Sequence, residues 1–506
     1  MLPSIRCLAL LGLLLVGLLT TTPVGPAPSL EPTRDDVAGQ SGGPFRRLFL
    51  DPLNVSRQQG LTRVFHPLER HPGSPVLKAT EPWEREGSGP YLYGTVLWDG
   101  GRLRMWYHLV NGGYRNAYAE SADGLHWTKP RLGLREFGGS KDNNLFLTVT
   151  QDPKESPVDK DRGQCHNPSV IKQTWEKDPS KRYALFCWGA DYNAVRVAYS
   201  PDGLRWSFVP ETARRGLFES SDVVNFAYDP YQKRYLATWK GATRRGRSVG
   251  VAVSPDGLRW EKLSQTPLFA ADDLDPPETQ VYGMPVFPYQ GLYIGLPWIY
   301  HAKVHYPPEM LMTREEAEVG SPCTVDVRLA WSHDLVNWTR PPDRQPFLPL
   351  GPKGALDSGM VYTARAPVQV GDRLYFYYGG FDGPHNSGAS RAAIGLATLR
   401  LDGFCSLHAG DQEGWLITKR EKLTRPEVTL NARTELGGSV KAEILDLSGK
   451  PIPGFTRQEC LPFTGDSTAH TLRWRTPRLP KSQEGTVKQL RVFLRKADIY
   501  SYLPAD

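Results

Sequence analysis

Five residues with acid, base or ligand-binding side chains each stand just before or at the start of a predicted innermost strand of a repeated β unit. They are four carboxylates and one imidazole: Glu86, His166, Asp222, Glu278 and Asp357. When such strands surround one axis, the side chains at their starts converge on one rim. Crowding and burial then raise the pKa of one carboxyl group, while hydrogen bonds keep another ionised. Two carboxyl groups in these two states are what cleavage of a glycosidic bond requires.

Three of these residues are the predicted catalytic groups. Glu278 is followed by Thr-Gln-Val-Tyr282, whose apolar and aromatic side chains would keep its carboxyl protonated, so it is the predicted general acid. Asp222 follows two serines, whose hydroxyl and backbone N–H groups would hold it ionised. Asp357 precedes Ser-Gly in a similarly polar setting and is either the base or a group that stabilises the transition state.

Six further residues are predicted to bind substrate. The aromatic ones offer flat faces that can stack on sugar rings, and His385 and Arg391 follow the second strand of the fifth unit, from where they can reach the rim. The alternative for each polar residue is a structural one, since a carboxylate before a strand also caps turns and His166 precedes Asn-Pro. The predicted substrate-binding residues are Glu86, His166, Tyr282, Trp298, His385 and Arg391.

The elements that must position these residues are built on one repeated motif. Residues 197–206 read Val-Ala-Tyr-Ser-Pro-Asp-Gly-Leu-Arg-Trp and return almost unchanged at 251–260, with looser copies at 117–127, 329–338 and 396–404. The apolar alternation is the period of a strand, and Asp-Gly supplies the positive φ of a tight turn. The Ser and Asp side chains can cap backbone N–H groups there. The motif therefore predicts a structural hairpin between two outer strands and no contact with substrate.

Five copies of one unit predict five blades of four strands each. The expected fold class is all-β, a five-bladed β-propeller followed by a C-terminal β-sandwich. The expected innermost strands are 93–99, 167–174, 222–228, 282–289 and 364–370. The expected second strands are 102–110, 182–189, 234–240, 292–300 and 373–379.

The flanking segments complete the predicted domain organisation. Residues 30–89 read as a tail and an arm that wraps the propeller rim, and 90–411 as the propeller itself. From 412 to 506 the Asp-Gly unit is gone, and short strands between Gly- and Pro-containing turns predict a β-sandwich. Within the propeller, the segment 301–322 is a long loop with a helical stretch at 313–318.

The N-terminus and the composition bear on cellular location and partners. Residues 1–29 have an early Arg6 and an apolar run at 7–19, the layout of a signal peptide, and that run is too short to span a bilayer comfortably. The expected protein is secreted or periplasmic, without stable membrane insertion. A formal charge of +7 spread over 506 residues, with no Lys/Arg tract, argues against nucleic-acid binding. Cysteine spacing matches no zinc site, and no metal or cofactor is predicted.

Ser-x-Asp-Gly-x-x-Trp hairpins in five blades, followed by a sandwich, resemble the five-bladed propeller glycoside hydrolases of families 32, 43, 62, 68 and 130. The layout is most similar to family 32. The resemblance implies an Asp nucleophile or base, a second Asp that stabilises the transition state, and a Glu acid. This sequence lacks that family's Trp-Met-Asn-Asp-Pro-Asn-Gly and Arg-Asp-Pro motifs, and Leu50-Asp-Pro-Leu-Asn54 is a poor match to the first. Its catalytic residues therefore cannot be transferred by motif.

Three functions remain open from the sequence. The first is an exported hydrolase that acts on an oligo- or polysaccharide with paired carboxylates at the propeller axis. The second is a propeller that binds glycans without cleaving them. The third is a glycoside phosphorylase, which would need a cluster of basic side chains in the pocket to hold phosphate.

Overall fold

The computed structural model describes most of the chain after the N-terminal segment. The described residues are 45–110, 114–148, 165–189, 194–303, 318–388, 390–423, 425–475, 477, 480–481 and 484–504. Their regular secondary structure is almost entirely β, and the α-helices among them are α1 (Pro82–Arg85) and α2 (Pro210–Arg215). None of these described helices has the length and apolarity to cross a membrane. The predicted signal peptide and most of the helical stretch 313–318 fall outside the described residues.

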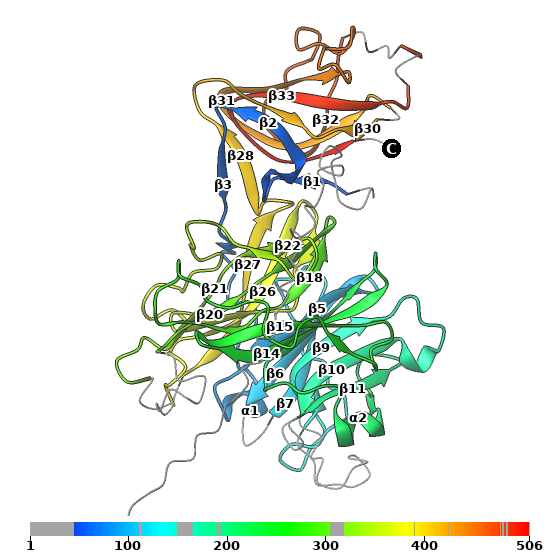
Figure 1. Ribbon diagram of the computed structural model, residues 1–506. Coiled ribbons are helices and arrows are strands. Elements are labelled where there is room, and N and C mark those ends of the chain that lie inside the picture. Colours follow the sequence, from blue (N-terminus) through cyan, green and yellow to red (C-terminus); the bar gives the residue numbers. More distant parts are fainter. Residues whose placement is uncertain are drawn as a thin grey trace, which may run out of the picture.

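The chain forms a propeller arrangement of sheets with an additional sheet at one end (Figure 1). Four of the propeller sheets have four antiparallel strands each. The first contains β5 (Tyr91–Asp99), β6 (Arg102–Val110), β7 (Tyr114–Ser121) and β8 (Leu145–Leu147). The second contains β9 (His166–Lys172), β10 (Tyr183–Gly189), β11 (Ala194–Ser200) and β12 (Ser207–Phe208). The third contains β13 (Val224–Asp229), β14 (Arg234–Thr243), β15 (Gly246–Ser254) and β16 (Glu261–Lys262). The fourth contains β18 (Val286–Tyr289), β19 (Leu292–Gly295), β22 (Ala330–Ser332) and β23 (Trp338–Thr339).

The repeated motif forms the predicted hairpin between the third and fourth strands of a sheet. In the third sheet the hydroxyl of Ser254 accepts from the N–H of Gly257 (2.8 Å), and Oδ1 of Asp256 accepts from two further N–H groups of the turn (both 2.9 Å). The indole N–H of Trp260 donates to the Gly257 carbonyl (2.9 Å), and its ring packs on Phe186 of the preceding sheet. Gly257 has φ +79°, and Leu335 adopts φ +70° where the fourth copy lacks the glycine. The motif therefore joins adjacent sheets as well as closing its own hairpin.

These hairpins make the free energy of unfolding depend on pH. Burial alone would raise the pKa of Asp256, but the hydrogen bonds that it accepts lower it to about 2, and the pKa values of Asp123, Asp202 and Asp334 are also lowered. A carboxyl group with a depressed folded-state pKa stabilises the fold above its unfolded pKa, and that stability is lost as pH falls. We expect the free energy of unfolding to fall as pH drops from about 4 towards 2.

Asp256→Asn is the matched variant for this expectation, because an amide oxygen still accepts the turn N–H groups but does not titrate. Thermal unfolding midpoints at about pH 5 and about pH 2.5 measure the effect. The wild-type midpoint should fall further than that of the variant. Equal falls would show that the hairpin carboxylate does not contribute to the acid sensitivity.

The fourth repeat departs from the predicted pattern because its strands are interrupted. The innermost strand expected at 282–289 is divided into β17 (Thr279–Gly283) and β18, and the second strand into β19 and β20 (Trp298–His301). Pro285 and Pro297 stand at these breaks, and a proline has no N–H to donate to a ladder. The divided repeat contributes to two different sheets.

An eight-stranded sheet contains part of the fourth repeat and most of the fifth repeat. It runs β17, β20, β21 (Thr324–Val327), β24 (Met360–Thr363), β26 (Arg373–Phe381), β27 (Ala392–Arg400) and β4 (Glu69–Arg70), with β25 (Val368–Val370) also paired to β26. The two repeats join through a parallel contact between Val325 and Met360. In place of five separate blades the structure has four separate four-stranded sheets and this shared sheet, so the count of five stays a prediction.

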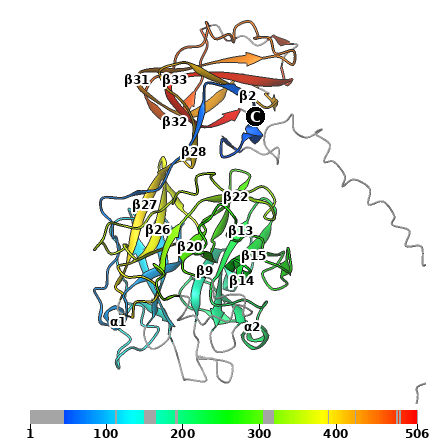
Figure 2. The ribbon, with the colours of Figure 1, turned by 60° about the vertical axis from the view of Figure 1, so that its left-hand side comes forward.

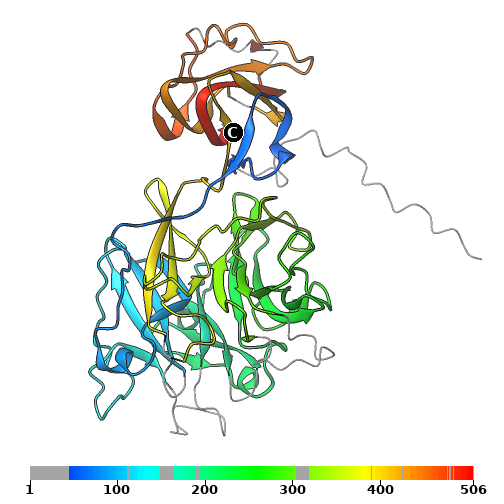
Figure 3. The same ribbon diagram turned by 90° about the vertical axis from the view of Figure 1, so that its left-hand side faces the viewer.

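The additional sheet has nine strands, and three come from the N-terminal segment. Its strands are β1 (Arg47–Leu48), β2 (Val55–Gln59), β3 (Thr62–Phe65), β28 (Cys405–Ala409), β29 (Gly414–Thr418), β30 (Glu421–Lys422), β31 (Val428–Leu445), β32 (Asp466–Thr471) and β33 (Val487–Pro504). The segment expected to wrap the propeller rim therefore pairs first with the C-terminal strands (Figure 3). Only its second half follows the propeller, where β4 pairs with β27.

The C-terminal sheet begins earlier than the boundary predicted near residue 412, because β28 already pairs with β3 and β33. The chain passes directly from β27 into β28 on its way out of the propeller (Figure 2). The nine strands enclose a core of their own, which includes Phe49, Leu407, Ile444 and Val492. The predicted two-sheet sandwich stays a prediction.

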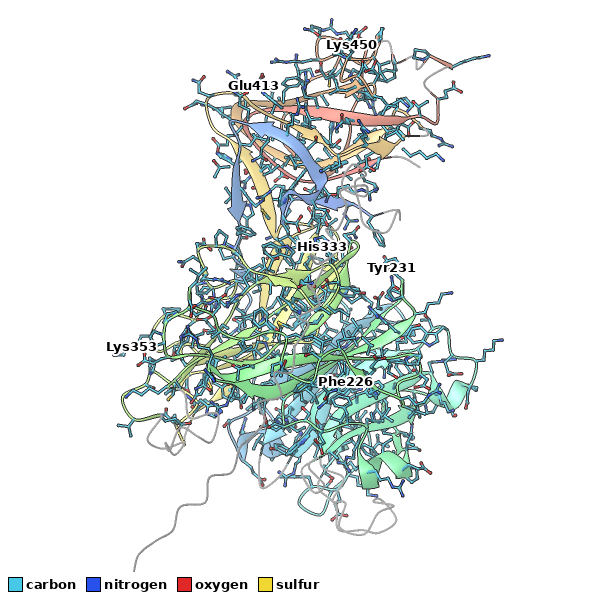
Figure 4. All side chains as sticks on the ribbon, viewed as in Figure 1. Phe226, Tyr231, His333, Lys353, Glu413 and Lys450 are labelled. Carbon is cyan, nitrogen blue, oxygen red and sulfur yellow. The ribbon has the colours of Figure 1, made fainter. Side chains whose placement is uncertain are left out.

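Polar contacts fix the additional sheet against the propeller. Arg46 pairs with Asp402 through two hydrogen bonds (2.5 and 2.9 Å), and Tyr289, at the end of β18, donates to the same carboxylate (2.6 Å). His333 lies at the junction (Figure 4), where its Nε2 is 2.8 Å from a carboxylate oxygen of Asp51. The contact at Tyr289 is at the end of an inner strand, on the rim opposite to the one where inner strands begin.

Candidate functional site

A cavity of about 610 Å³ opens where the inner strands begin. The elements around it contribute the starts of first and third strands and the ends of second strands, which an antiparallel meander brings to the same rim. Asp222 precedes β13, Lys240 lies near the end of β14, and Arg247 lies at the start of β15. We call this the axial cavity; its lining residues are Tyr114, Trp188, Ser221, Asp222, Lys240, Gly241, Ala242, Arg247, Tyr282 and His385.

Asp222 is the carboxylate of the axial cavity, as predicted. Its Oδ1 accepts from the Lys240 ammonium (2.8 Å) and from the hydroxyl of Ser221 (3.0 Å). Burial alone would raise the pKa of Asp222. The positive charge of Lys240, the electrostatic effect of the neighbouring His166 and the two hydrogen bonds together lower this pKa to about 2. The side chain is therefore an ionised acceptor at neutral pH, and the expectation that a neighbouring serine helps to hold it ionised is confirmed.

His166 lies beside Asp222 but behind the cavity wall. Its Nδ1 donates to the backbone carbonyl of Asp222 (2.7 Å), which fixes the tautomer with the proton on Nδ1. Its ring packs against Tyr114 (4.6 Å between centroids) and Tyr93 (5.4 Å). Burial lowers the pKa of His166, so the ring is neutral near pH 7. We infer that His166 orients the Asp222 backbone and is not itself a lining residue.

Tyr282 and His385, both predicted to bind substrate, meet in the axial cavity. The Tyr282 hydroxyl is 3.1 Å from Nε2 of His385, and Nδ1 of His385 is 3.9 Å from a carboxylate oxygen of Glu318. The Tyr300 hydroxyl donates to that same oxygen (3.1 Å). Tyr282 and His385 are thus within hydrogen-bond distance of each other, whereas the 3.9 Å between His385 and Glu318 is longer than a hydrogen bond.

Lys240 and Arg247 are the charged lining residues that the sequence did not predict, and Tyr114 and Trp188 are aromatic ones. The Lys240 ammonium lies 4.4 Å from the centroid of the Tyr282 ring as well as on Asp222. Arg247 donates to the side-chain oxygen of Gln280 (3.0 Å) and lies 5.0 Å from the Tyr300 ring centroid. The antiparallel order of the strands could have predicted these positions. In such a sheet the turn between the second and third strands lies at the same rim as the start of the first strand.

Trp298, a predicted substrate-binding residue, is fully buried with 0% of its surface exposed. Its ring stacks on Tyr93 (5.2 Å between centroids) and meets Tyr362 edge to face (5.2 Å). Its indole N–H donates to the hydroxyl of Thr363 (3.2 Å). A ring without exposed surface cannot stack on a sugar, so Trp298 supports the site from within the core.

Asp357 lies in a different cavity, of about 390 Å³, next to the N-terminal arm. Its carboxylate accepts from Nε of Arg70 (2.6 Å) and from the hydroxyl of Tyr378 (2.8 Å). Burial, followed by the charge of Asp357, raises the pKa of Tyr378 to about 12. The innermost strand of the fifth repeat begins with β24 at Met360, earlier in the chain than the predicted start at residue 364, and Asp357 is bound by Arg70 of the N-terminal arm.

The remaining predicted residues are not brought into the axial cavity. Glu278 is exposed, so the apolar surroundings expected to keep its carboxyl protonated are not formed. Arg391 is exposed and pairs with Asp382 (2.7 Å). Glu86 has half of its side chain exposed and lies 3.4 Å from Arg115. Glu278 and Arg391 stand directly before β17 and β27, and Glu86 stands a few residues before β5, so a position at the start of a strand did not by itself bring these side chains into the cavity.

Within the described ranges no three His, Cys, Asp or Glu side chains are grouped so as to hold a metal ion. The axial cavity offers a single carboxylate among its described lining residues, together with ammonium and guanidinium groups. Hard divalent cations prefer several oxygen ligands, so this donor set suits an anion better than a metal.

Comparisons with known proteins identify similar structures but no family. No family model matches the chain, and no curated protein matches it. One similar solved structure is a glycosyl hydrolase from Bacteroides ovatus (15% identity, TM-score 0.44, 67% of this chain and 94% of that one). Another is from work describing GH130 mannoside phosphorylases and hydrolases that target β-1,2 mannosidic linkages in Candida mannan (15%, 0.44, 67% and 94%). A third is the Bombyx mori GH32 β-fructofuranosidase BmSUC1 (11%, 0.39, 86% and 95%).

Proposed function

We propose that this protein cleaves glycosidic bonds of an oligo- or polysaccharide in the axial cavity. The observation that carries the proposal is Asp222, a carboxylate held ionised on the wall of a cavity of about 610 Å³. Around it stand aromatic rings that can stack on sugars and hydroxyl and imidazole groups that can carry a proton. The Ser-x-Asp-Gly-x-x-Trp hairpins and their resemblance to propeller glycoside hydrolases support the same reaction class.

The attack on the anomeric carbon and the protonation of the leaving oxygen are assigned to two different groups of residues in the cavity. Asp222, with a pKa of about 2, acts as the base or nucleophile, or stabilises positive charge that develops at the anomeric carbon. The proton for the leaving oxygen comes from the Tyr282–His385 pair, with His385 as the donor, because an imidazole gives and takes protons near neutral pH. This replaces Glu278, whose exposed carboxyl lies outside the cavity lining.

Phosphorolysis is a second candidate reaction, and Lys240 and Arg247 favour it. Attack by inorganic phosphate needs cations at the reacting centre, and these two line the cavity beside Asp222. Product analysis with and without inorganic phosphate separates the two reactions. Hydrolysis releases a free reducing sugar in either condition, whereas phosphorolysis requires phosphate and releases a sugar 1-phosphate.

Activity of the purified protein on aryl glycosides and on plant and microbial polysaccharides tests the proposal. Neutral and acidic polysaccharides both belong in the panel. Turnover that disappears in Asp222→Asn would support the assignment. Saturable binding of a glycan without turnover, in protein purified with its fold intact, would instead establish the glycan-binding function.

We also propose the finer architecture and the location that the sequence predicts. The eight-stranded sheet and the divided fourth repeat together complete a ring of five blades, and the nine-stranded sheet folds on itself as a sandwich. The protein is exported to the periplasm or the medium. Residues 1–35, fused to a reporter enzyme, should direct its secretion, with cleavage near Leu30. A reporter retained in the cytosol with Met1 in place would refute the export proposal.

A further inference from the structure

Arg365 is a cation of the propeller interior, and no carboxylate among the described residues pairs with it. It lies between β24 and β25, on the innermost segment of the fifth repeat, and is only partly exposed. Burial lowers the pKa of Arg365 to about 10, and no charge within the described residues offsets this. Burial alone would also lower the pKa of Arg46, but the hydrogen bonds and charge of Asp402 raise it. Arg365 has no such compensation.

The polar contacts of Arg365 are made to the innermost strand of the first repeat. Its backbone N–H donates to the Gly94 carbonyl (3.2 Å), and its Nε donates to the Thr95 hydroxyl (3.2 Å). The Thr95 oxygen also accepts from the N–H of Val170 on β9 (2.8 Å). A hydroxyl has two acceptor lone pairs and one hydrogen, so two incoming donors leave that hydrogen to donate. The Thr95 hydroxyl and the Nη groups of Arg365 are thus neighbouring donors for which the described residues supply no acceptor.

Ser169 and Asn225 occupy the position of Thr95 in the second and third repeats. The Ser169 hydroxyl accepts from the N–H of Phe226 (3.2 Å), just as the Thr95 hydroxyl accepts from the N–H of the residue after Ser169. Asn225 directly precedes Phe226, so it is the third member of this series. Asn225 is 3% exposed, and neither its side-chain oxygen nor its nitrogen has a partner in the described chain. A buried amide without partners is costly, so this level of the axis has room for one.

This level lies deeper along the propeller axis than the axial cavity. Tyr93, two residues before Thr95 on β5, stacks on Trp298 (5.2 Å between centroids) and meets Tyr362 edge to face (4.9 Å). All three rings are buried. Because β5 runs away from the rim where the axial cavity opens, Thr95 and Arg365 lie beyond this layer of rings. The donors around Arg365 are therefore separate from the proposed reacting centre.

We propose that the propeller interior binds a small monovalent anion of the chloride type, held by the Arg365 guanidinium and the Thr95 hydroxyl at the level of the Asn225 amide. A buried cation is far less costly with an anion beside it than alone. Since Arg365 keeps some exposed surface, an ion from solvent can reach it. The proposal does not depend on the reaction in the axial cavity. The competing occupant is an ordered water molecule, which satisfies donors without a charge.

Thermal unfolding in chloride and in gluconate measures anion binding in solution, because gluconate is too large for a site between strands. Exchanging one sodium salt for the other at a constant total of about 200 mM keeps the screening of surface charges unchanged. A ligand that binds only the folded protein raises the unfolding midpoint. We expect the wild-type midpoint to rise by about 2 °C or more between about 2 and about 200 mM chloride. Bromide should act in the same way, and equal midpoints in all mixtures would leave water as the occupant and overturn the proposal.

Arg365→Met removes the charge and keeps a long side chain. Its midpoint should not respond to chloride, and in gluconate it should equal or exceed that of the wild type, because an uncompensated cation has been removed. Thr95→Val is the second variant, which keeps the test open if the first does not fold; it should raise the chloride concentration of half effect by about 10-fold. Arg102→Met is the matched control, since Arg102 has a side chain 53% exposed and pairs with Glu120 at the surface. It should respond to chloride as the wild type does.

Crystals soaked in bromide locate the ion directly, because bromide scatters anomalously at its absorption edge. We expect an anomalous peak beside the Arg365 guanidinium and the Thr95 hydroxyl in the wild type, and none there in Arg365→Met. A peak confined to the axial cavity would contradict the proposal. So would a chloride response that survives in Arg365→Met and is lost in Lys240→Met, since it would place the anion on the lysine of the axial cavity.

Discussion

Asp222→Asn is expected to lower kcat by about 10³-fold, with KM changed much less, on whichever glycoside the wild type cleaves. The substitution keeps the shape of the side chain and removes its charge. The charge is what the Lys240 ammonium at 2.8 Å and the Ser221 hydroxyl at 3.0 Å stabilise, and these contacts hold the pKa of Asp222 at about 2. An amide can neither accept a proton from water nor stabilise positive charge at the anomeric carbon.

Glu278→Gln is the matched control for this measurement, because it makes the same acid-to-amide change at a carboxylate outside the axial cavity. Its kcat should stay within about twofold of the wild type. Steady-state kinetics of the two variants, with thermal unfolding to confirm the fold, gives a direct comparison. The reverse result, a large loss in Glu278→Gln and a small one in Asp222→Asn, would return the general acid to Glu278 and contradict the site described above.

Trp298→Ala is expected to lower the free energy of unfolding by about 3–5 kcal/mol, the range for removal of a large aromatic side chain from a core. The ring is 0% exposed, stacks on Tyr93 and meets Tyr362 edge to face. Its removal leaves a cavity inside the wall that supports Tyr282, whose ring is itself 5.6 Å from that of Tyr362. Chemical denaturation, with wild type and variant measured at one temperature, gives the change.

Trp98→Ala is the control of the same chemical type, since Trp98 is 42% exposed and lies at the far end of its strand. We expect it to cost less than about 1 kcal/mol. If Trp298→Ala were as mild as the control and instead raised KM strongly, the ring would be a substrate platform, as the sequence alone had indicated. A strong loss of stability with KM unchanged in the remaining folded protein supports the buried role.

Local chemistry determined the parts of the fold that the sequence predicted well. The hairpins at 197–206 and 251–260 need only residues within ten positions of one another. The Ser hydroxyl, the Asp carboxylate and the Gly φ specify the turn together, and the structure has all three. Four innermost strands begin within a few residues of the predicted positions, because apolar alternation and flanking turns are local signals as well.

Strand pairings between segments far apart in the sequence have no comparable local signal that would predict them. The ladder of β3 with β28 joins residues more than three hundred positions apart, and no composition signal links the two. The division of the fourth repeat could have been suspected from Pro285 and Pro297, but whether a proline ends a strand depends on the partner that would have received its N–H. The parallel contact of β21 with β24 could be identified only from the tertiary structure, which places both strands.

For the site, the sequence by itself determined Asp222 and the two side chains that meet across from it, Tyr282 and His385. These follow from position near inner-strand starts or from the loop after the second strand of the fifth repeat. The tertiary structure alone decided which other candidates face the cavity, because a residue directly before a strand can face the axis or be exposed to solvent, as Glu278 is. It also brought Lys240 and Arg247 to the rim from the two sides of one turn, beside Asp222.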